Sequence, residues 1–209
     1  MTTTAAHVRG QHGAGTLADL LLPSMASGLA AFTRATLLVV AGAALTALAA
    51  QLAFMVPWTP VPYTGQTAAV LLVGTALGAR KGAASMALYL LAGLVGLPVY
   101  AGGLHGVEKL FGLTGGYLFG FVLASALVGR LAENGWDRSR VGAALLMALG
   151  NLVIYLVGVP VLAVVSGLAW STAVWSGAVV FLPWDAAKIA VAALVLPLAW
   201  RWAGNERQD

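Results

Sequence analysis

Long apolar stretches without charged residues constrain this chain more than any other feature of its sequence. Residues 35–56, for example, contain no Asp, Glu, Lys or Arg. Only 9% of the 209 residues are charged, against about 25% in soluble domains. Most of the surface must therefore face a solvent other than water, and the lipid bilayer is the abundant apolar one. The sequence predicts a polytopic membrane protein and excludes an ordinary cytosolic enzyme and a disordered chain.

Six segments are predicted to cross the bilayer, which makes the expected fold class all-α. A helix needs about 20 residues to cross the hydrocarbon core, so a chain of this length has room for six spans and short loops. Prolines, glycines and charged residues separate the segments. The predicted spans are residues 35–56, 66–79, 82–97, 113–131, 141–165 and 183–200.

The remaining segments are predicted from their polarity. Residues 1–34 are expected to form a tail and an apolar interfacial segment, broken by Asp19 and Pro23. Residues 35–201 would form the membrane domain, and residues 202–209 a C-terminal tail. The prolines after residue 56 predict a rigid extended loop. Residues 166–182 could be an outer loop, a half-helix or the lead-in to the last span.

The basic residues predict the orientation. With six spans, nine of them fall on one side, Lys109 falls on the other, and Lys188 lies inside the last span. Because positive charge accumulates on the cytoplasmic side, both termini are expected in the cytoplasm. The nine are Arg9, Arg34, Arg80, Lys81, Arg130, Arg138, Arg140, Arg201 and Arg207. Since they are scattered singly, the net charge of +4 indicates topology rather than nucleic-acid binding.

Several functional classes lack their signatures. The chain has no cysteine, which excludes disulfides, cysteine-ligated metals and cysteine nucleophiles. It contains no Gly-x-Ser-x-Gly, no His-Glu-x-x-His and no ATPase motif. His105 and Glu108 in one loop are weak grounds for a metal site. We therefore expect neither catalysis nor a cofactor or metal.

Asp185 and Lys188 are the most informative pair. A charge at membrane depth costs at least about 2.5–3.5 kcal/mol, so it faces a partner or a polar cavity. Three residues apart on one helix, the two side chains share a face. They could form a self-neutralising ion pair. Alternatively, they could form a ligand site near the outer mouth, with Lys188 meeting a carboxylate and Asp185 accepting from N–H groups.

Other polar residues could complete such a site. Asn151 in the fifth span either ties helices together or contacts a ligand. Thr64 and Gln66 belong to a proline-fixed loop that is either a plain turn or a lid over the site. Tyr117 could offer a hydroxyl group and a ring face.

Five motifs in matching order resemble the BioY family, the biotin-binding substrate components of energy-coupling-factor transporters. The resemblance covers about residues 35–200. The chain departs from the family pattern at Leu113, where proline is usual, and at Trp184, where glycine is frequent. The motifs are Val61-Pro62-Tyr63-Thr64-Gly65-Gln66-Thr67, Gly96-Leu97-Pro98-Val99-Tyr100-Ala101-Gly102-Gly103, Thr114-Gly115-Gly116-Tyr117-Leu118-x-Gly120-Phe121, Gly150-Asn151-Leu152-x-Ile154-Tyr155 and Phe181-Leu182-Pro183-x-Asp185-x-x-Lys188.

The resemblance implies a six-helix substrate component in the bacterial cytoplasmic membrane that captures biotin from outside. Its implied partners are a transmembrane coupling protein and a pair of ATPases. Ala43 and Ala47 resemble the small-residue face that such components offer to the coupling protein. The residues expected to bind the substrate are Asp185, Lys188, Asn151, Tyr117, Thr64 and Gln66. Three alternatives remain: a site for another small vitamin (thiamine or riboflavin-like), an intramembrane enzyme, or a structural protein without a ligand.

Overall fold

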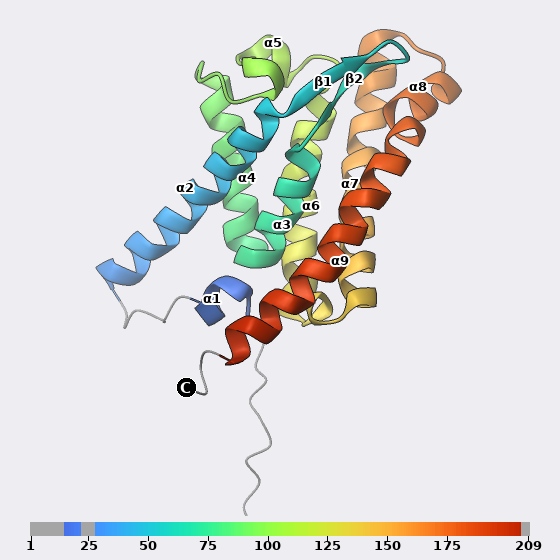
Figure 1. The fold of residues 1–209 in the computed structure, drawn as a ribbon. Helices are drawn as coiled ribbons and strands as arrows, with labels where there is room; N and C mark the ends of the chain where they lie inside the picture. The colour runs from blue at the N-terminus through green and yellow to red at the C-terminus, as the bar shows by residue number, and fades with distance from the viewer. Residues whose placement is uncertain (1–14, 22–27, 206–209) are drawn as a thin grey trace, which may run out of the picture.

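A bundle of helices, capped at one end by a short hairpin, makes up the computed structural model, which describes residues 15–21 and 28–205 (Figure 1). The longer helices are α2 (Leu29–Gln51), α3 (Gln66–Leu77), α4 (Ala79–Leu94), α6 (Gly115–Glu133), α7 (Arg140–Ser166) and α9 (Leu182–Asn205). Short helical elements join or flank them: α1 (Leu17–Leu21), η1 (Ala101–Gly103), α5 (Val107–Leu110), η2 (Trp136–Arg138), α8 (Trp170–Gly177) and η3 (Val179–Phe181).

Four helical stretches of the described chain are long and apolar enough to cross a membrane. They are α2, α6, α7 and the stretch Trp170–Ala203, which contains α8 and α9. The other two predicted spans correspond to α3 and α4, which are shorter, at 12 and 16 residues. Residues 166–182, for which three structures were open, contain the short helix α8 and the turn η3.

The proline-rich segment after the first helix is a β-hairpin, not the predicted extended loop. Strands β1 (Ala53–Val56) and β2 (Thr59–Thr64) pair in antiparallel register, with Phe54 opposite Tyr63. Proline is tolerated on edge strands, and both strands of a two-stranded sheet are edges. The predicted first span was therefore too long at this end, because the apolar residues 53–56 belong to β1.

At its other end α2 begins before the predicted span, at Leu29. Arg34 suggested a boundary at residue 35, but it lies within the helix. Its guanidinium group donates to the backbone oxygen of Ala18 at 3.0 Å and lies 3.7 Å from the Asp19 carboxylate. These contacts stabilise the charge, so the helix can continue through it.

Helix α6 lies at the centre of the bundle and packs against α3, α4 and α7. Glycine permits the closest of these approaches. A Cβ atom at Gly74 would lie 2.5 Å from the backbone oxygen of Ser125, so α3 could not pack this closely against α6 with a larger residue. A single residue, Gly78 (φ +83°), turns the chain from α3 into α4. Small residues at membrane helix contacts are expected for packing in lipid.

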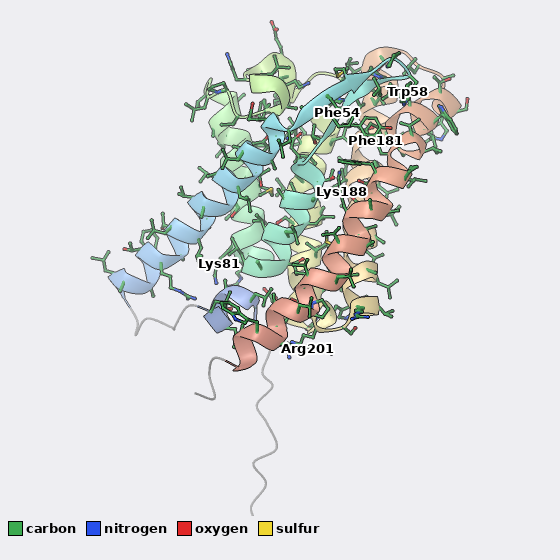
Figure 2. The ribbon with its side chains drawn as sticks, in the orientation of Figure 1. Phe54, Trp58, Lys81, Phe181, Lys188 and Arg201 are labelled. Carbon is green, nitrogen blue, oxygen red and sulfur yellow. The ribbon has the colours of Figure 1, made fainter. Side chains whose placement is uncertain are left out.

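Basic side chains gather at the end of the bundle opposite the hairpin. Figure 2 shows Lys81 and Arg201 at that end and Trp58 at the hairpin end. Arg34 and Lys81 both contact Asp19 there, and Arg130 pairs with Glu133 at 3.1 Å. Glu133 also accepts from the backbone N–H of Ala79 at 2.9 Å. This charge asymmetry is the pattern that the positive-inside rule describes.

Candidate functional site

A cavity under the β-hairpin brings together residues from eight elements of the chain. Strand β2 and the start of α3 contribute Thr64 and Gln66, and the starts of α6 and α9 contribute Tyr117 and Asp185. Loop residues around η1 and α5 complete the outer wall, and α7 contributes Tyr155. Figure 2 shows Lys188 and Phe181 below the hairpin. Both residues line the cavity. Residues far apart in sequence thus form one concave site.

Asp185 and Lys188 lie on this cavity and contact each other, as their spacing predicts. Asp185 is 4% exposed and lies in the first turn of α9, where the helix dipole favours a carboxylate. Its Oδ1 atom lies 3.2 Å from the Lys188 Nζ atom, and its Oδ2 atom accepts a short hydrogen bond from the Tyr155 hydroxyl. The carboxylate is therefore held in place by two partners while one side of it borders the cavity.

All three N–H donors of the Lys188 ammonium group already have acceptors. Besides Asp185, Nζ donates to Thr67 Oγ1 at 2.7 Å and to the backbone oxygen of Thr64 at 3.1 Å. An ammonium group has three donors and no acceptor. Lys188 therefore ties α9 to β2 and α3 and neutralises Asp185, and the arrangement leaves it no spare donor for a ligand carboxylate.

Thr64, Gln66 and Tyr117 all line the cavity, as predicted. The Thr64 side chain accepts from the Gln66 backbone N–H at 3.2 Å, which starts α3. Gln66 donates from Nε2 to the Tyr89 hydroxyl at 2.7 Å, and this fixes its amide. Its Oε1 atom has no hydrogen-bond partner among residues 15–21 and 28–205, which leaves one acceptor for a ligand.

Tyr117 contributes its ring rather than its hydroxyl group. The hydroxyl donates to the backbone oxygen of Gly177 at 2.8 Å. The ring packs on α7 at Gly158, where a Cβ atom would lie 2.4 Å from the ring. The tyrosine therefore forms an apolar wall of the cavity, and its polar atom anchors α8.

Asn151 does not line the cavity. It lies on α7 one turn before Tyr155, on the same face of the helix, and is 6% exposed. Its Oδ1 atom is buried and has no partner in the described chain. A buried amide oxygen without a donor is rare in proteins. A role for Asn151 in ligand contact stays a prediction.

Among the lining residues that the sequence analysis did not select, Lys109 and Thr114 carry polar groups without partners in the described chain. Lys109 comes from α5, and burial lowers the pKa of its ammonium group. Thr114 is 9% exposed, and its hydroxyl oxygen has no partner within the described residues. Lys109 also has no hydrogen bond or ion pair there. A cation and a hydroxyl group without partners can together hold an anion.

An aromatic cluster lies beside the hairpin, and one of its members, Phe181, lines the cavity. Phe54 stacks on Tyr63 with ring centroids 5.3 Å apart, and Tyr63 lies 4.4 Å from the Phe181 ring. Trp184 meets Phe54 edge-on at 6.2 Å and covers Lys188 at 5.5 Å, but it does not line the cavity. The bulky residue at this position therefore shields Lys188 from outside.

The two alanines expected at a partner interface lie on α2. Ala43 is buried and Ala47 is half-buried, and the buried face of α2 packs mainly on α4. Several large apolar residues on the opposite face are exposed, including Leu37, Leu45 and Leu48. The use of Ala43 and Ala47 by a partner stays a prediction.

Known proteins resemble this chain over most of its length. The relatives include a protein named biotin transporter BioY from Thermotoga maritima, 40% identical over 67% of this chain and 81% of its own length. A second, of the same name, from Rhizobium etli, is 34% identical over 65% of this chain and 76% of its own. Among solved structures, the S-component for biotin from an ECF-type ABC transporter has a TM-score of 0.76 and 24% identity. It matches over 84% of this chain and 95% of its own. The sequence model of the BioY family matches residues 18–205, and the chain belongs to this family.

Proposed function

We propose that the cavity binds biotin and that the chain is the substrate component of an energy-coupling-factor-type transporter. The chemistry of the cavity supports this. Biotin has a ureido ring with N–H donors and a carbonyl group, and it has a carboxylate tail. The cavity offers acceptors at Asp185 and Gln66 for the ring, and a cation and a hydroxyl group at Lys109 and Thr114 for the tail. Few polar groups in a mostly apolar pocket are typical of small-molecule sites.

The observation that carries the proposal is that the two lysines on the cavity differ in their hydrogen-bond partners. Lys188 is fully engaged by Asp185, Thr64 and Thr67, so its role is to hold and neutralise the acceptor. Lys109 has no partner in the described part of the chain and borders the same cavity. We therefore assign the carboxylate to Lys109, whereas one of the two interpretations of the sequence had placed a carboxylate on Lys188.

The proposal includes the membrane arrangement. Six helices, α2, α3, α4, α6, α7 and α9, would cross the bacterial cytoplasmic membrane, with both termini in the cytoplasm. The concentration of basic residues at the end opposite the hairpin supports this orientation. The cavity, at the hairpin end, would then open outward. Energy for uptake would come from a coupling protein and an ATPase pair, because the chain carries no ATPase motif.

Retention of tritiated biotin by membranes that contain the protein tests the function. We expect retention that unlabelled biotin removes and that thiamine or riboflavin does not. Membranes with the Asp185→Asn/Lys188→Met variant, inserted to the same level, serve as the matched control and should retain little. Retention equal to that of empty membranes would overturn the proposal, and displacement by thiamine or riboflavin would assign the site to another vitamin.

A further inference from the structure

Gln66 presents an acceptor to the cavity because of a neighbour that does not itself line the cavity. The Gln66 Nε2 atom donates to the hydroxyl oxygen of Tyr89 on α4 at 2.7 Å. The same hydroxyl group donates to the backbone oxygen of Val99 at 3.0 Å. Tyr89 and Val99 are not among the lining residues. The three groups form a relay of hydrogen bonds from the loop after α4 to the cavity wall.

The backbone carbonyl group at the far end of this relay sets the direction of every hydrogen bond in it. A carbonyl oxygen only accepts, and a tyrosine hydroxyl group has one hydrogen to donate. Because that hydrogen is on Val99, the Tyr89 oxygen accepts, and the amide nitrogen of Gln66 must face it. The amide oxygen then faces the cavity. The reverse order would leave the Val99 oxygen without the one donor that it has among the described residues.

Packing holds the Tyr89 hydroxyl group in this place. Tyr89 is 1% exposed, and its ring meets the Tyr100 ring edge-on with the centroids 5.6 Å apart. Tyr100 in turn donates from its hydroxyl group to the Leu90 backbone oxygen at 2.6 Å. Its ring lies over Gly93, where a Cβ atom would clash with it. Gln66 is 5% exposed. The amide is therefore fixed in orientation as long as Tyr89 keeps its hydroxyl group.

Tyr89 differs from the other tyrosines in what it accepts. Each of the five tyrosines donates its hydroxyl hydrogen to an acceptor of the protein. Only Tyr89, among the described residues, also accepts a hydrogen bond from a side chain that lines the cavity. The acceptors of Tyr63, Tyr89, Tyr100, Tyr117 and Tyr155 are, in turn, the backbone oxygens of Val180, Val99, Leu90 and Gly177 and the carboxylate of Asp185.

We propose that Tyr89 is a positioning residue that determines the specificity of the site. It makes Gln66 an acceptor, and the site therefore selects a ligand that brings an N–H group to this point. The inference rests on the proposed function, in which the ureido ring of biotin brings one N–H to Gln66 and the other to Asp185. A ring oxygen in place of the first N–H would set two acceptors against each other, and such a mismatch is strongly rejected. Without the Tyr89 hydroxyl group, the amide can turn and offer its own N–H.

Tyr89→Phe tests the inference, because it keeps the ring and removes only the hydroxyl group. The probes are biotin and two cyclic carbamates, each of them biotin with one ureido N–H replaced by oxygen. Competition against tritiated biotin on membranes gives the three affinities. In the natural protein each carbamate should bind at least ~10-fold more weakly than biotin. In Tyr89→Phe biotin should bind roughly 3- to 10-fold more weakly. The gap between biotin and the carbamate whose oxygen faces Gln66 should narrow by a similar factor, whereas the gap for the other carbamate should stay.

Two further variants separate positioning from packing. Tyr63→Phe is the matched control, because it removes a hydroxyl group that donates to a backbone oxygen, that of Val180 at 2.6 Å, without a hydrogen bond to Gln66. It should leave both carbamate gaps unchanged. Gln66→Met removes the amide and should narrow the same gap as Tyr89→Phe. Adding Tyr89→Phe to Gln66→Met should narrow it no further, because the tyrosine acts through the amide.

The outcomes distinguish this inference from the proposed function. If Tyr89→Phe leaves all three affinities unchanged, or lowers them by the same factor, Tyr89 has only a packing role and the inference is overturned. Biotin binding by the natural protein would still stand in that case. Absence of tritiated biotin binding by the natural protein would instead contradict the proposed function, and with it the role of Tyr89.

Discussion

At the scale of single residues, charge burial decides which side chains can meet a ligand. Asp185 and Lys188 could be found from sequence because charges inside an apolar helix need a partner or a cavity. Lys109 could not, because a lysine beside Glu108 in a glycine-rich loop is normally solvated. Its burial depends on how η1 and α5 fold over the cavity, which no local pattern encodes. Thr114 belongs to the Thr-Gly-Gly-Tyr motif that the sequence analysis recognised. Its polar role follows only from the structure, in which its buried hydroxyl oxygen has no hydrogen-bond partner among the described residues.

The assignment of the carboxylate to Lys109 gives a prediction about ligand charge. Lys109→Gln should weaken biotin binding by roughly 10-fold or more, as expected for loss of a charged hydrogen bond. Binding of biotin amide, which has no carboxylate, should not change. Lys109→Arg keeps the charge and should retain most of the affinity. Competition against tritiated biotin measures all three, and equal losses for biotin and its amide would remove Lys109 from the carboxylate.

The same residue predicts a pH dependence. Burial lowers the pKa of Lys109 below its ordinary value of 10.5. A lysine whose pKa is lowered loses its proton at a lower pH than an exposed one, and the neutral amine no longer attracts a carboxylate. Biotin affinity should therefore decline as pH rises through this lowered pKa, starting below pH 10.5. The Lys109→Gln variant should show no such decline, and a parallel decline in both proteins would point to another group.

The buried Asp185–Lys188 pair predicts opposite outcomes for stability and binding. Removal of one partner leaves a buried charge uncompensated, so Asp185→Asn should cost about 3–5 kcal/mol of folding stability. Asp185→Asn with Lys188→Met removes both charges and should recover most of that loss. Neither variant should bind biotin. Thermal unfolding in detergent checks the predicted stabilities, and biotin retention checks the predicted loss of binding. Full binding by the double variant would show that the pair has only a structural role.

At the scale of elements, the sequence predicted helices better than their ends. Charged and proline residues were taken as boundaries, yet α2 continues through Arg34 and α9 through Arg201. In both places the helix reaches the end of the bundle where basic residues gather. The hairpin was missed because prolines at 60 and 62 argue against a strand, and only an isolated pair of edges tolerates them. The packing of α1 also depends on contacts with four distant helices.

An aspartate between α6 and α7 holds the C-terminal end of α9 in place. Asp137 is fully buried and accepts from the Trp200 indole N–H at 2.7 Å, while the Arg138 guanidinium group lies 4.5 Å from the Trp200 ring. Asp137→Ala should cost about 1–3 kcal/mol, because the indole donor is left without an acceptor. Asp137→Asn keeps an acceptor and should be at least as stable as the natural protein near pH 7. Thermal unfolding compares the three.

The Asp137 carboxyl group also predicts how stability depends on pH. Burial raises its pKa above 3.8, although the Trp200 N–H and Arg138 act to lower it. The folded protein then holds this proton more tightly than the unfolded chain. Its contribution to stability is present below pH 3.8 and is lost as pH rises through the raised pKa. Acidification toward that value should therefore stabilise the natural protein relative to Asp137→Asn, and an unchanged difference would contradict this.

At the scale of the whole molecule, tryptophan side chains gather near the two ends of the bundle. Trp58, Trp170 and Trp175 lie on the hairpin and α8, whereas Trp136, Trp200 and Trp202 lie on η2 and the end of α9. Tryptophan gathers at both membrane–water interfaces. Two such levels are expected for a bundle that spans a bilayer. Beyond the short helices α3 and α4, the hairpin, η1 and α5 extend the bundle at the hairpin end (Figure 1). The sequence predicted the helix order but not this cap.

Cysteine labelling tests the orientation, because the natural chain has no cysteine. His105 lies in the loop before α5, whereas Arg80 and Arg140 lie at the opposite end, and all three are exposed. If basic residues face the cytoplasm, His105→Cys reacts with a membrane-impermeant maleimide in intact cells. Arg80→Cys and Arg140→Cys should react only after the membrane is permeabilised. Labelling of Arg80→Cys from outside would invert the bundle and place the vitamin cavity on the cytoplasmic side, where capture from the medium is impossible.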